Sequence, residues 1–195
     1  MKKIPKLELI ELNEAYNKVM QWFFSYPLLP ISLSDLSGEL SISKKTASQI
    51  VTQLIKDNFL HKEEIGNTWR ITCNLKHEYN KTKKISYNLS LVYQLIYDAK
   101  IIDEIYKLTG NPKAIILFGS YRKGDDTENS DLDIAVEIVG NEELKIINLG
   151  TIQQLGYRKN IPLNIHIFSR NKIDINLFSN IVNGIVLEGF LEARI

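Results

Sequence analysis

The sequence has almost no cysteine and no long apolar run. Cys73 is the only cysteine among 195 residues, so neither an intrachain disulfide nor a zinc site made of cysteines can form. The longest stretch without a charged residue, 19–34, has 16 residues and two prolines, which is too short and too interrupted to cross a bilayer. Lys6, Glu8 and Glu11 interrupt the apolar stretch that a signal peptide would need. We therefore expect a cytoplasmic protein that makes no contact with a membrane.

An excess of charge of one sign is also lacking. The chain has 24 Lys and Arg against 23 Asp and Glu, and 44% of its residues are hydrophobic, which excludes a disordered chain and an overall polycation. The two halves differ, however, because residues 1–84 carry 13 basic and 9 acidic side chains, whereas 85–195 carry 11 and 14. We therefore predict two domains, 1–84 and 85–195, with different partners, and expect a nucleic-acid face only in the first.

The first half has the periodicity of helices followed by a hairpin. Apolar residues recur at helical spacing up to Pro27, and Ser34 and Ser43 are placed to cap two further helices. Alternation then replaces the helical period on both sides of the turn-forming pair Gly66-Asn67. The expected elements are helices over 13–26, 35–40 and 44–58 and strands over 59–65 and 68–73.

This order of elements resembles the winged helix-turn-helix of prokaryotic transcription regulators, as does the segment 34–48, SDLSGELSISKKTAS. The resemblance implies that the third helix enters the major groove of double-stranded DNA while the hairpin lies along the backbone. The alternative is a solvated helix face on a dimerisation or docking module. The residues expected to contact DNA are Lys44, Lys45, Ser48, Gln49 and Thr52 on the helix and Arg70 on the hairpin.

Two segments join the halves. Residues 75–88 are polar and basic and are expected to form a connection. From Leu89 to Tyr106 apolar residues recur every three or four positions, which predicts an amphipathic helix that ends before Gly110. This connecting helix, placed within 85–112, has an apolar stripe that serves either as core or as the seam of a homodimer.

The residues that point to chemistry follow this helix. Residues 114–118 are an apolar run that predicts a buried strand, and the run ends in Gly119 and Ser120. Asp131 and Asp133 begin a second predicted strand, 130–137, and alternation places both carboxylates on one face. Adjacent carboxylates repel each other, and a divalent cation that prefers oxygen ligands relieves the repulsion. A glycine lets the backbone approach a phosphate, and the Ser120 hydroxyl can bind its oxygens.

Together these features resemble the nucleotidyltransferase signature of the DNA polymerase beta superfamily. The stretch 117–124, LFGSYRKG, followed by SDLD at 130–133, resembles the minimal nucleotidyltransferase domains of archaea and bacteria. The resemblance implies an α+β protein in which the winged helix-turn-helix domain precedes a mixed sheet with flanking helices. It also implies Mg²⁺ or Mn²⁺ and a nucleoside triphosphate, with Asp131 and Asp133 as catalytic metal ligands and Gly119 and Ser120 on the phosphates. Lys123 stands where many relatives have arginine and either contacts a phosphate or is a solvated lysine.

One departure from the family pattern bears on activity. Active members usually carry a third carboxylate on the next strand, which here is predicted over 161–168. The outward residues of that strand are Asn164 and His166, neither of which is acidic. Asn164 lacks the charge that anchors a second metal, and His166 is either a substitute base or a packed residue. Glu137 has the parity of the two aspartates but lies too far along its strand to replace the missing acid.

These observations leave three functions in competition. The first is an enzyme that transfers a nucleoside monophosphate to an unidentified hydroxyl, with the winged helix placing it on DNA or on a protein. Minimal nucleotidyltransferases often pair with small helical HEPN proteins as antitoxins, so the resemblance implies such a partner. The second is a transcription regulator whose degenerate domain binds nucleotide without catalysis, and the third is an interaction protein. The remaining segments, 142–157 and 175–182, are predicted to be helices that pack on the sheet.

Overall fold

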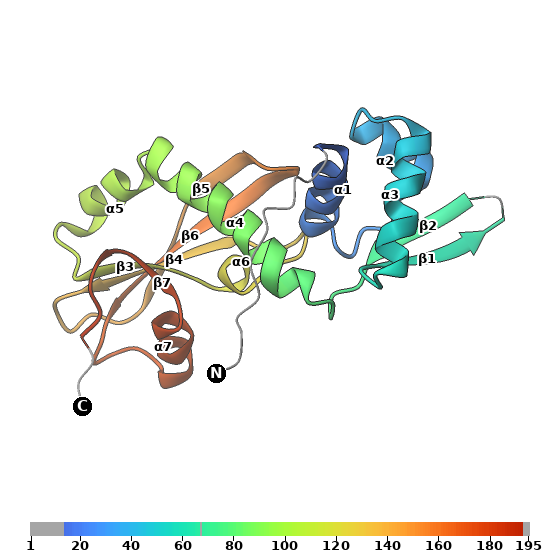
Figure 1. The fold of residues 1–195 in the computed structure, drawn as a ribbon. Helices are drawn as coiled ribbons and strands as arrows, with labels where there is room; N and C mark the ends of the chain where they lie inside the picture. Colours follow the sequence, from blue (N-terminus) through green and yellow to red (C-terminus); the bar gives the residue numbers. More distant parts are fainter. Residues whose placement is uncertain (1–13, 67, 193–195) are drawn as a thin grey trace, which may run out of the picture.

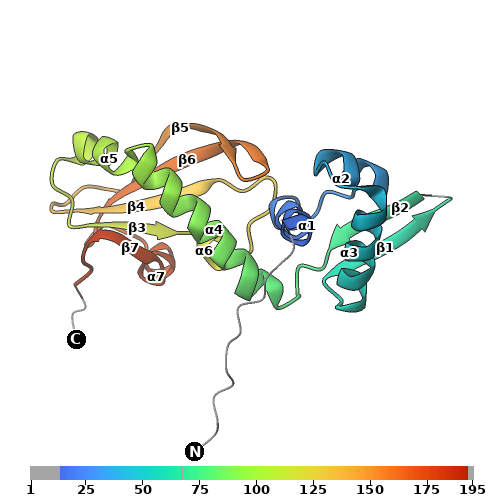
Figure 2. The same cartoon turned by 45° about the horizontal axis from the view of Figure 1, so that its top comes forward.

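A computed structural model describes residues 14–66 and 68–192 of the chain (Figure 1). The molecule is elongated, with three helices and a β-hairpin at one end and a larger sheet at the other. Helix α4 (Tyr79–Asp98) runs from the first part across the second (Figures 1 and 2). None of the helices in the described ranges is long and apolar enough to span a membrane.

The N-terminal part has the predicted order of elements. Three helices are followed by two antiparallel strands, and Ile31 adds a single bridge to Ile71. Ser43 caps the third helix as predicted, because its hydroxyl accepts a hydrogen bond from Thr46 N at 3.0 Å. Asn67, half of the predicted turn, lies outside the described residues. The elements are α1 (Glu14–Ser25), α2 (Leu33–Glu39), α3 (Lys44–Lys56), β1 (Leu60–Ile65) and β2 (Thr68–Cys73).

The predicted start of the second helix is wrong by two residues. Ser32, not Ser34, is the cap, and its hydroxyl accepts a hydrogen bond from Asp35 N at 3.1 Å. The backbone of Ser32 is extended, so that Leu33 already lies in the first turn of the helix.

The predicted connection 75–88 is largely wrong, because α4 begins at Tyr79. The buried positions of α4 recur every four residues, as expected for a packed helix. The first three of them are polar, so a search for apolar periodicity does not detect the start of the helix. They are Asn80, Lys84, Asn88, Val92 and Ile96. The predicted boundary between residues 84 and 85 therefore falls inside a helix, and the division into domains stays a prediction.

The predicted helix 89–106 is two helices. The backbone of Lys100 is left-handed, with φ of 54°, and separates α4 from α5 (Ile101–Thr109). The break turns Ile101, Ile102 and Ile105 into the core, which a continuous helix would not do. Gly110 ends α5 as predicted.

A five-stranded sheet forms the second part, in the order β5-β6-β4-β3-β7. β4 and β6 are parallel and the other neighbours are antiparallel. Helices α4 and α5 cover one face, and α7 (Ile175–Val182), predicted from the sequence, covers the other (Figure 2). The strands are β3 (Ala114–Phe118), β4 (Leu132–Ile138), β5 (Lys145–Leu155), β6 (Arg158–Ser169) and β7 (Ile185–Gly189).

The predicted helix 142–157 is wrong, because most of this segment is the edge strand β5. A bulge between Asn148 and Gly150 shifts the register against β6 and breaks the alternation. The core-facing residues are therefore Ile147, Leu149, Ile152 and Leu155, whose spacing of two and three residues imitates a helix.

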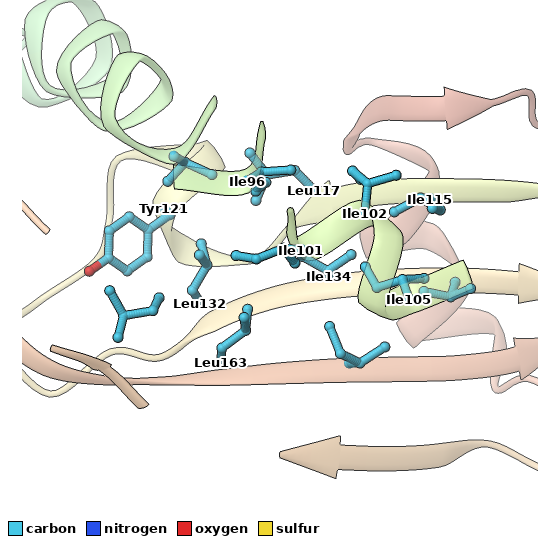
Figure 3. Packing of buried hydrophobic residues seen from close by; sticks show 14 of the residues in the cluster. Ile96, Ile101, Ile102, Ile105, Ile115, Leu117, Tyr121, Leu132, Ile134 and Leu163 are labelled. Carbon is cyan, nitrogen blue, oxygen red and sulfur yellow. The ribbon is translucent and has the colours of Figure 1, made fainter. Parts of the chain in front are cut away.

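Alternation along β4 separates the core from the candidate site. Leu132, Ile134 and Val136 pack toward α4 and α5 in the cluster drawn in Figure 3. Asp133 and Glu137 have the opposite parity and therefore lie on the face that α7 covers. The rigid strand thus fixes where the carboxylates stand.

Candidate active site

Asp131 and Asp133 lie beside the Gly-Ser turn, as the sequence predicts. Asp131 immediately precedes β4, Asp133 is its second residue, and Asp133 pairs with Phe118 at the end of β3. Gly119 then adopts φ of 78°, and a Cβ atom there would lie 2.9 Å from Asp133 Oδ2. Only glycine therefore allows the backbone to turn this close to the carboxylate, and Ser120 follows as the first residue of the short helix α6 (Ser120–Lys123).

The neighbouring strand supplies two hydrogen-bond donors to the aspartates. The parallel register pairs Asp133 with Asn164. Asn164 and His166 lie on the same face as the two aspartates, as the parity of the strands predicts. Asn164 Nδ2 donates to Asp131 Oδ2 at 2.6 Å, and His166 Nε2 lies 2.9 Å from Asp133 Oδ1. A family member with a third carboxylate would place like charge here, whereas this chain places N–H groups.

The surroundings of His166 argue against its use as a base. The carboxylate of Asp133 is an acceptor, so Nε2 carries the proton of this hydrogen bond. Nδ1 is buried and has no partner among the described residues, and the ring packs edge-on against Phe118 at a centroid distance of 5.0 Å. A general base must come within hydrogen-bond reach of its proton, and neither ring nitrogen is open to a substrate in this conformation.

One carboxylate oxygen of each aspartate is still available to a ligand. Within the described part of the chain, Asp131 Oδ1, Asp133 Oδ2 and Ser120 Oγ take part in none of the hydrogen bonds or ion pairs. No group of three or more His, Cys, Asp or Glu side chains there can hold a metal. The residues present therefore fit Mg²⁺ as a site of two carboxylates that phosphate and water complete, which is how this ion usually binds.

Lys123 and Glu137 lie away from these oxygens. Lys123 is exposed at the end of α6, where its Nζ donates to Asn180 Oδ1 on α7 at 3.0 Å. Glu137 is buried at the other end of the same strand and forms an ion pair of 2.8 Å with Arg170. Glu137 is thus a poor replacement for the missing carboxylate, as the sequence indicated.

Sequence reasoning missed a buried cluster behind the site. Lys84 and Asn88 of α4 and Arg158 of β6 all bind the loop 124–130 or its flanks, which lead to Asp131. Their partners lie 28 to 42 residues away along the chain, so no local pattern signals the contacts.

The predicted DNA-contacting residues lie on α3 and on the hairpin. Lys44, Lys45, Gln49 and Thr52 are exposed and Ser48 is half-buried on α3. Arg70 is exposed on β2, where its guanidinium lies 3.9 Å from Glu63. Their role stays a prediction.

Comparison with known proteins agrees with the geometry of the second part. Residues 99–188 match the family described as Polymerase beta, Nucleotidyltransferase. A Methanocaldococcus jannaschii protein, named as a candidate protein adenylyltransferase, is 50% identical over 42 residues, which cover 22% of this chain. The match spans 38% of that protein's length, well under two thirds of it. Residues 99–188 therefore form a nucleotidyltransferase domain of the polymerase beta type.

Proposed function

We propose that this protein is a Mg²⁺-dependent nucleotidyltransferase that transfers a nucleoside monophosphate to a hydroxyl group of a protein. One observation carries the proposal: Asp131 and Asp133 stand beside the Gly119-Ser120 turn, and each keeps a carboxylate oxygen that no residue of the described ranges 14–66 and 68–192 binds. Carboxylate oxygens beside a glycine turn, where the backbone can approach a phosphate closely, are what a metal-nucleotide complex requires.

In the proposed reaction, the acceptor oxygen attacks the α-phosphorus of a nucleoside triphosphate. The bond from this phosphorus to the bridging oxygen of the β-phosphate breaks, pyrophosphate leaves, and the hydroxyl proton passes to solvent. Asp131 and Asp133 hold the cation, which offsets charge on the transferring group. The Ser120 hydroxyl and the backbone at Gly119 bind the β- and γ-phosphates, and Lys123, at the far end of α6, would add a cation only after releasing Asn180.

The acceptor class comes from the relative. Its name as a candidate protein adenylyltransferase supports ATP as donor and a protein as acceptor. A small helical HEPN-type protein is the partner that the sequence resemblance implies, and a tyrosine hydroxyl on it is our candidate acceptor.

A specific observation favours a second candidate, a regulator that binds nucleotide without turnover. Asn164 and His166 already satisfy one oxygen of each aspartate, so the site carries less uncompensated negative charge than three carboxylates would. In this candidate function a winged helix formed by the N-terminal part binds DNA through the exposed face of α3.

Incubation with α-labelled nucleotides separates the two candidates. Each nucleotide is offered with Mg²⁺ or Mn²⁺ to the protein alone and together with candidate protein acceptors. We expect label on a protein with ATP, and none with Asp131→Ala. Asp125→Ala, an exposed carboxylate in the neighbouring loop, serves as the matched control and should label normally. Nucleotide binding without any labelled product would favour the regulator.

DNA binding is tested by its dependence on salt. Each lost phosphate contact lowers the slope of log affinity against log salt concentration by about 0.9. Lys44→Ala with Lys45→Ala should therefore reduce the slope for duplex DNA, while Lys100→Ala, an exposed lysine before α5, should not. Absent or salt-insensitive binding by the unmodified protein would leave the N-terminal part as a docking module.

A further inference from the structure

The loop 124–130, which leads from α6 to Asp131, is held from behind by a buried arginine. Arg158, the first residue of β6, is 4% exposed. One of its guanidinium nitrogens donates to the carbonyl oxygens of Ser130 at 2.5 Å and Glu128 at 3.1 Å. The other donates to the Tyr121 hydroxyl. Ser130 directly precedes Asp131, so the arginine fixes the backbone one residue before the carboxylate.

A buried lysine holds the first half of the same loop. Lys84 and Asp126 are 1% and 2% exposed, and Lys84 Nζ lies 3.2 Å from Asp126 Oδ1. The same ammonium group donates to the backbone oxygen of Asp126 at 2.5 Å. Asn88 Nδ2 adds hydrogen bonds to Asp126 Oδ1 at 2.7 Å and to Tyr121 O at 3.1 Å. Burial nevertheless raises the pKa of the Asp126 carboxyl, because loss of water penalises its charged form.

Stability alone does not account for this arrangement. A buried ion pair gains little over well-packed apolar residues of the same volume, because both charges lose their water. The donors here end mainly on backbone carbonyls of one loop and its flanks, which fixes the path of the chain. The loop has its own reason to be fixed, because it carries the metal ligand at one end and follows the Gly-Ser turn by one short helix.

We propose that Arg158 and Lys84 are positioning residues, which hold the loop 124–130 so that Asp131 stands beside Asp133 in the geometry that a divalent cation needs. The proposal rests on the proposed function, because that function makes Asp131 a metal ligand. Residues behind metal ligands typically change metal affinity by about 10- to 100-fold when altered.

The test compares the two arginines at opposite ends of β6. Arg158→Lys keeps the charge but removes the planar fork, whose one nitrogen reaches the Ser130 and Glu128 carbonyls and whose other nitrogen reaches the Tyr121 hydroxyl. Arg170→Lys makes the same change just beyond the other end, where Arg170 binds Glu137 and not the loop. Mn²⁺ alone is titrated and followed by electron paramagnetic resonance. We expect Arg158→Lys to weaken Mn²⁺ binding by about 10-fold and Arg170→Lys to leave it unchanged.

Backbone hydrogen exchange gives a second readout that needs no metal. Arg158→Lys and Lys84→Met should speed exchange in 124–131, and Arg170→Lys should not. If Arg158→Lys does not fold, Asn88→Ala, which removes two bonds to this region and no charge, is measured in its place. Exchange and Mn²⁺ affinity both equal to wild type in a folded variant would overturn the proposal. Absence of Mn²⁺ binding in the wild type would defeat the proposed cation site, and the exchange rates would still decide the positioning role.

Discussion

Acidic residues lie on the same face at the two ends of β4, but the partners of their carboxylates differ. At the far end Glu137 is buried and faces two cations, with Arg170 at 2.8 Å and Lys113 at 4.0 Å. At the near end Asp131 and Asp133 are half-buried, and their carboxylates have as partners, within the described residues, the Asn164 amide and a ring N–H of His166. A cation neutralises a carboxylate, whereas a neutral amide such as that of Asn164 only solvates it. Among the described residues, the chain thus pairs the carboxylate with arginine and lysine at one end of the strand and with neither at the other.

The largest effect on nucleotide affinity is expected from removing the carboxylates of Asp131 and Asp133. Asp131→Ala with Asp133→Ala leaves a cation only phosphate and water as ligands. We expect Mg-nucleotide affinity to fall by more than about 100-fold. That figure is the upper limit of the loss in metal affinity when a residue that contacts a metal ligand is substituted. Titration calorimetry measures the affinity, with Asp125→Ala as the control. Equal affinity in the wild type and the double variant would remove the site from consideration.

A substitution of Glu137 should lower the free energy of unfolding and leave the affinity for Mg-nucleotide unchanged. Glu137→Gln removes the carboxylate partner of Arg170 and leaves Lys113 with its ion pair to Glu192 at 3.0 Å. Breaking a buried pair such as Arg170–Glu137 costs about 3 to 5 kcal/mol. We expect the lower figure, because the Arg170 and Lys113 side chains are 26% and 27% exposed. Urea denaturation gives the free energy of unfolding, and calorimetry should show unchanged Mg-nucleotide affinity. A loss of affinity without a loss of stability would contradict the contrast between the two ends.

Asn164→Asp should make the stability of the protein depend on a bound cation at Asp131 and Asp133. The substitution replaces an N–H donor 2.6 Å from Asp131 Oδ2 by a like charge, at nearly unchanged volume. Without Mg²⁺ the free energy of unfolding should fall by about 1 to 3 kcal/mol, and Mg²⁺ should restore it. Thermal denaturation with and without Mg²⁺ tests this. Nucleotidyl transfer should rise above wild type and disappear with Asp133→Ala. If wild type already turns over well and the substitution changes nothing, Asn164 is not what limits the site.

The smallest effect is expected from His166→Leu. The change removes one N–H donor from Asp133, whose side chain is 17% exposed and can turn to water. A lost hydrogen bond of this kind costs about 1 kcal/mol. Thermal denaturation should therefore show a smaller loss than for Glu137→Gln. An equal loss of stability in the two variants would mean that Asp133 depends on its protein partner as much as Glu137 does.

The parts of the site that sequence predicts are those set by local patterns. An apolar strand, a Gly-Ser turn and two aspartates two residues apart fix Gly119, Asp131 and Asp133, and strand parity places Asn164 and His166 opposite them. The residues behind the site were missed because their contacts join distant segments. Lys84 looks like a linker lysine until Asp126, 42 residues later, is brought beside it. The bulge at Gly150 hid β5 in a similar way, because it changes the period of the strand.

Because α4 belongs to both parts of the molecule, the chain does not divide cleanly between residues 84 and 85. Its 20 residues span about 30 Å, and its first turns supply the ammonium group of Lys84 that Asp126 needs. A fragment that begins at residue 85 would bury the Asp126 charge without its lysine, with Asn88 still bound to it, and should expose the loop that ends at Asp131. A fragment that contains the whole second part therefore begins no later than Tyr79, with its first helix intact.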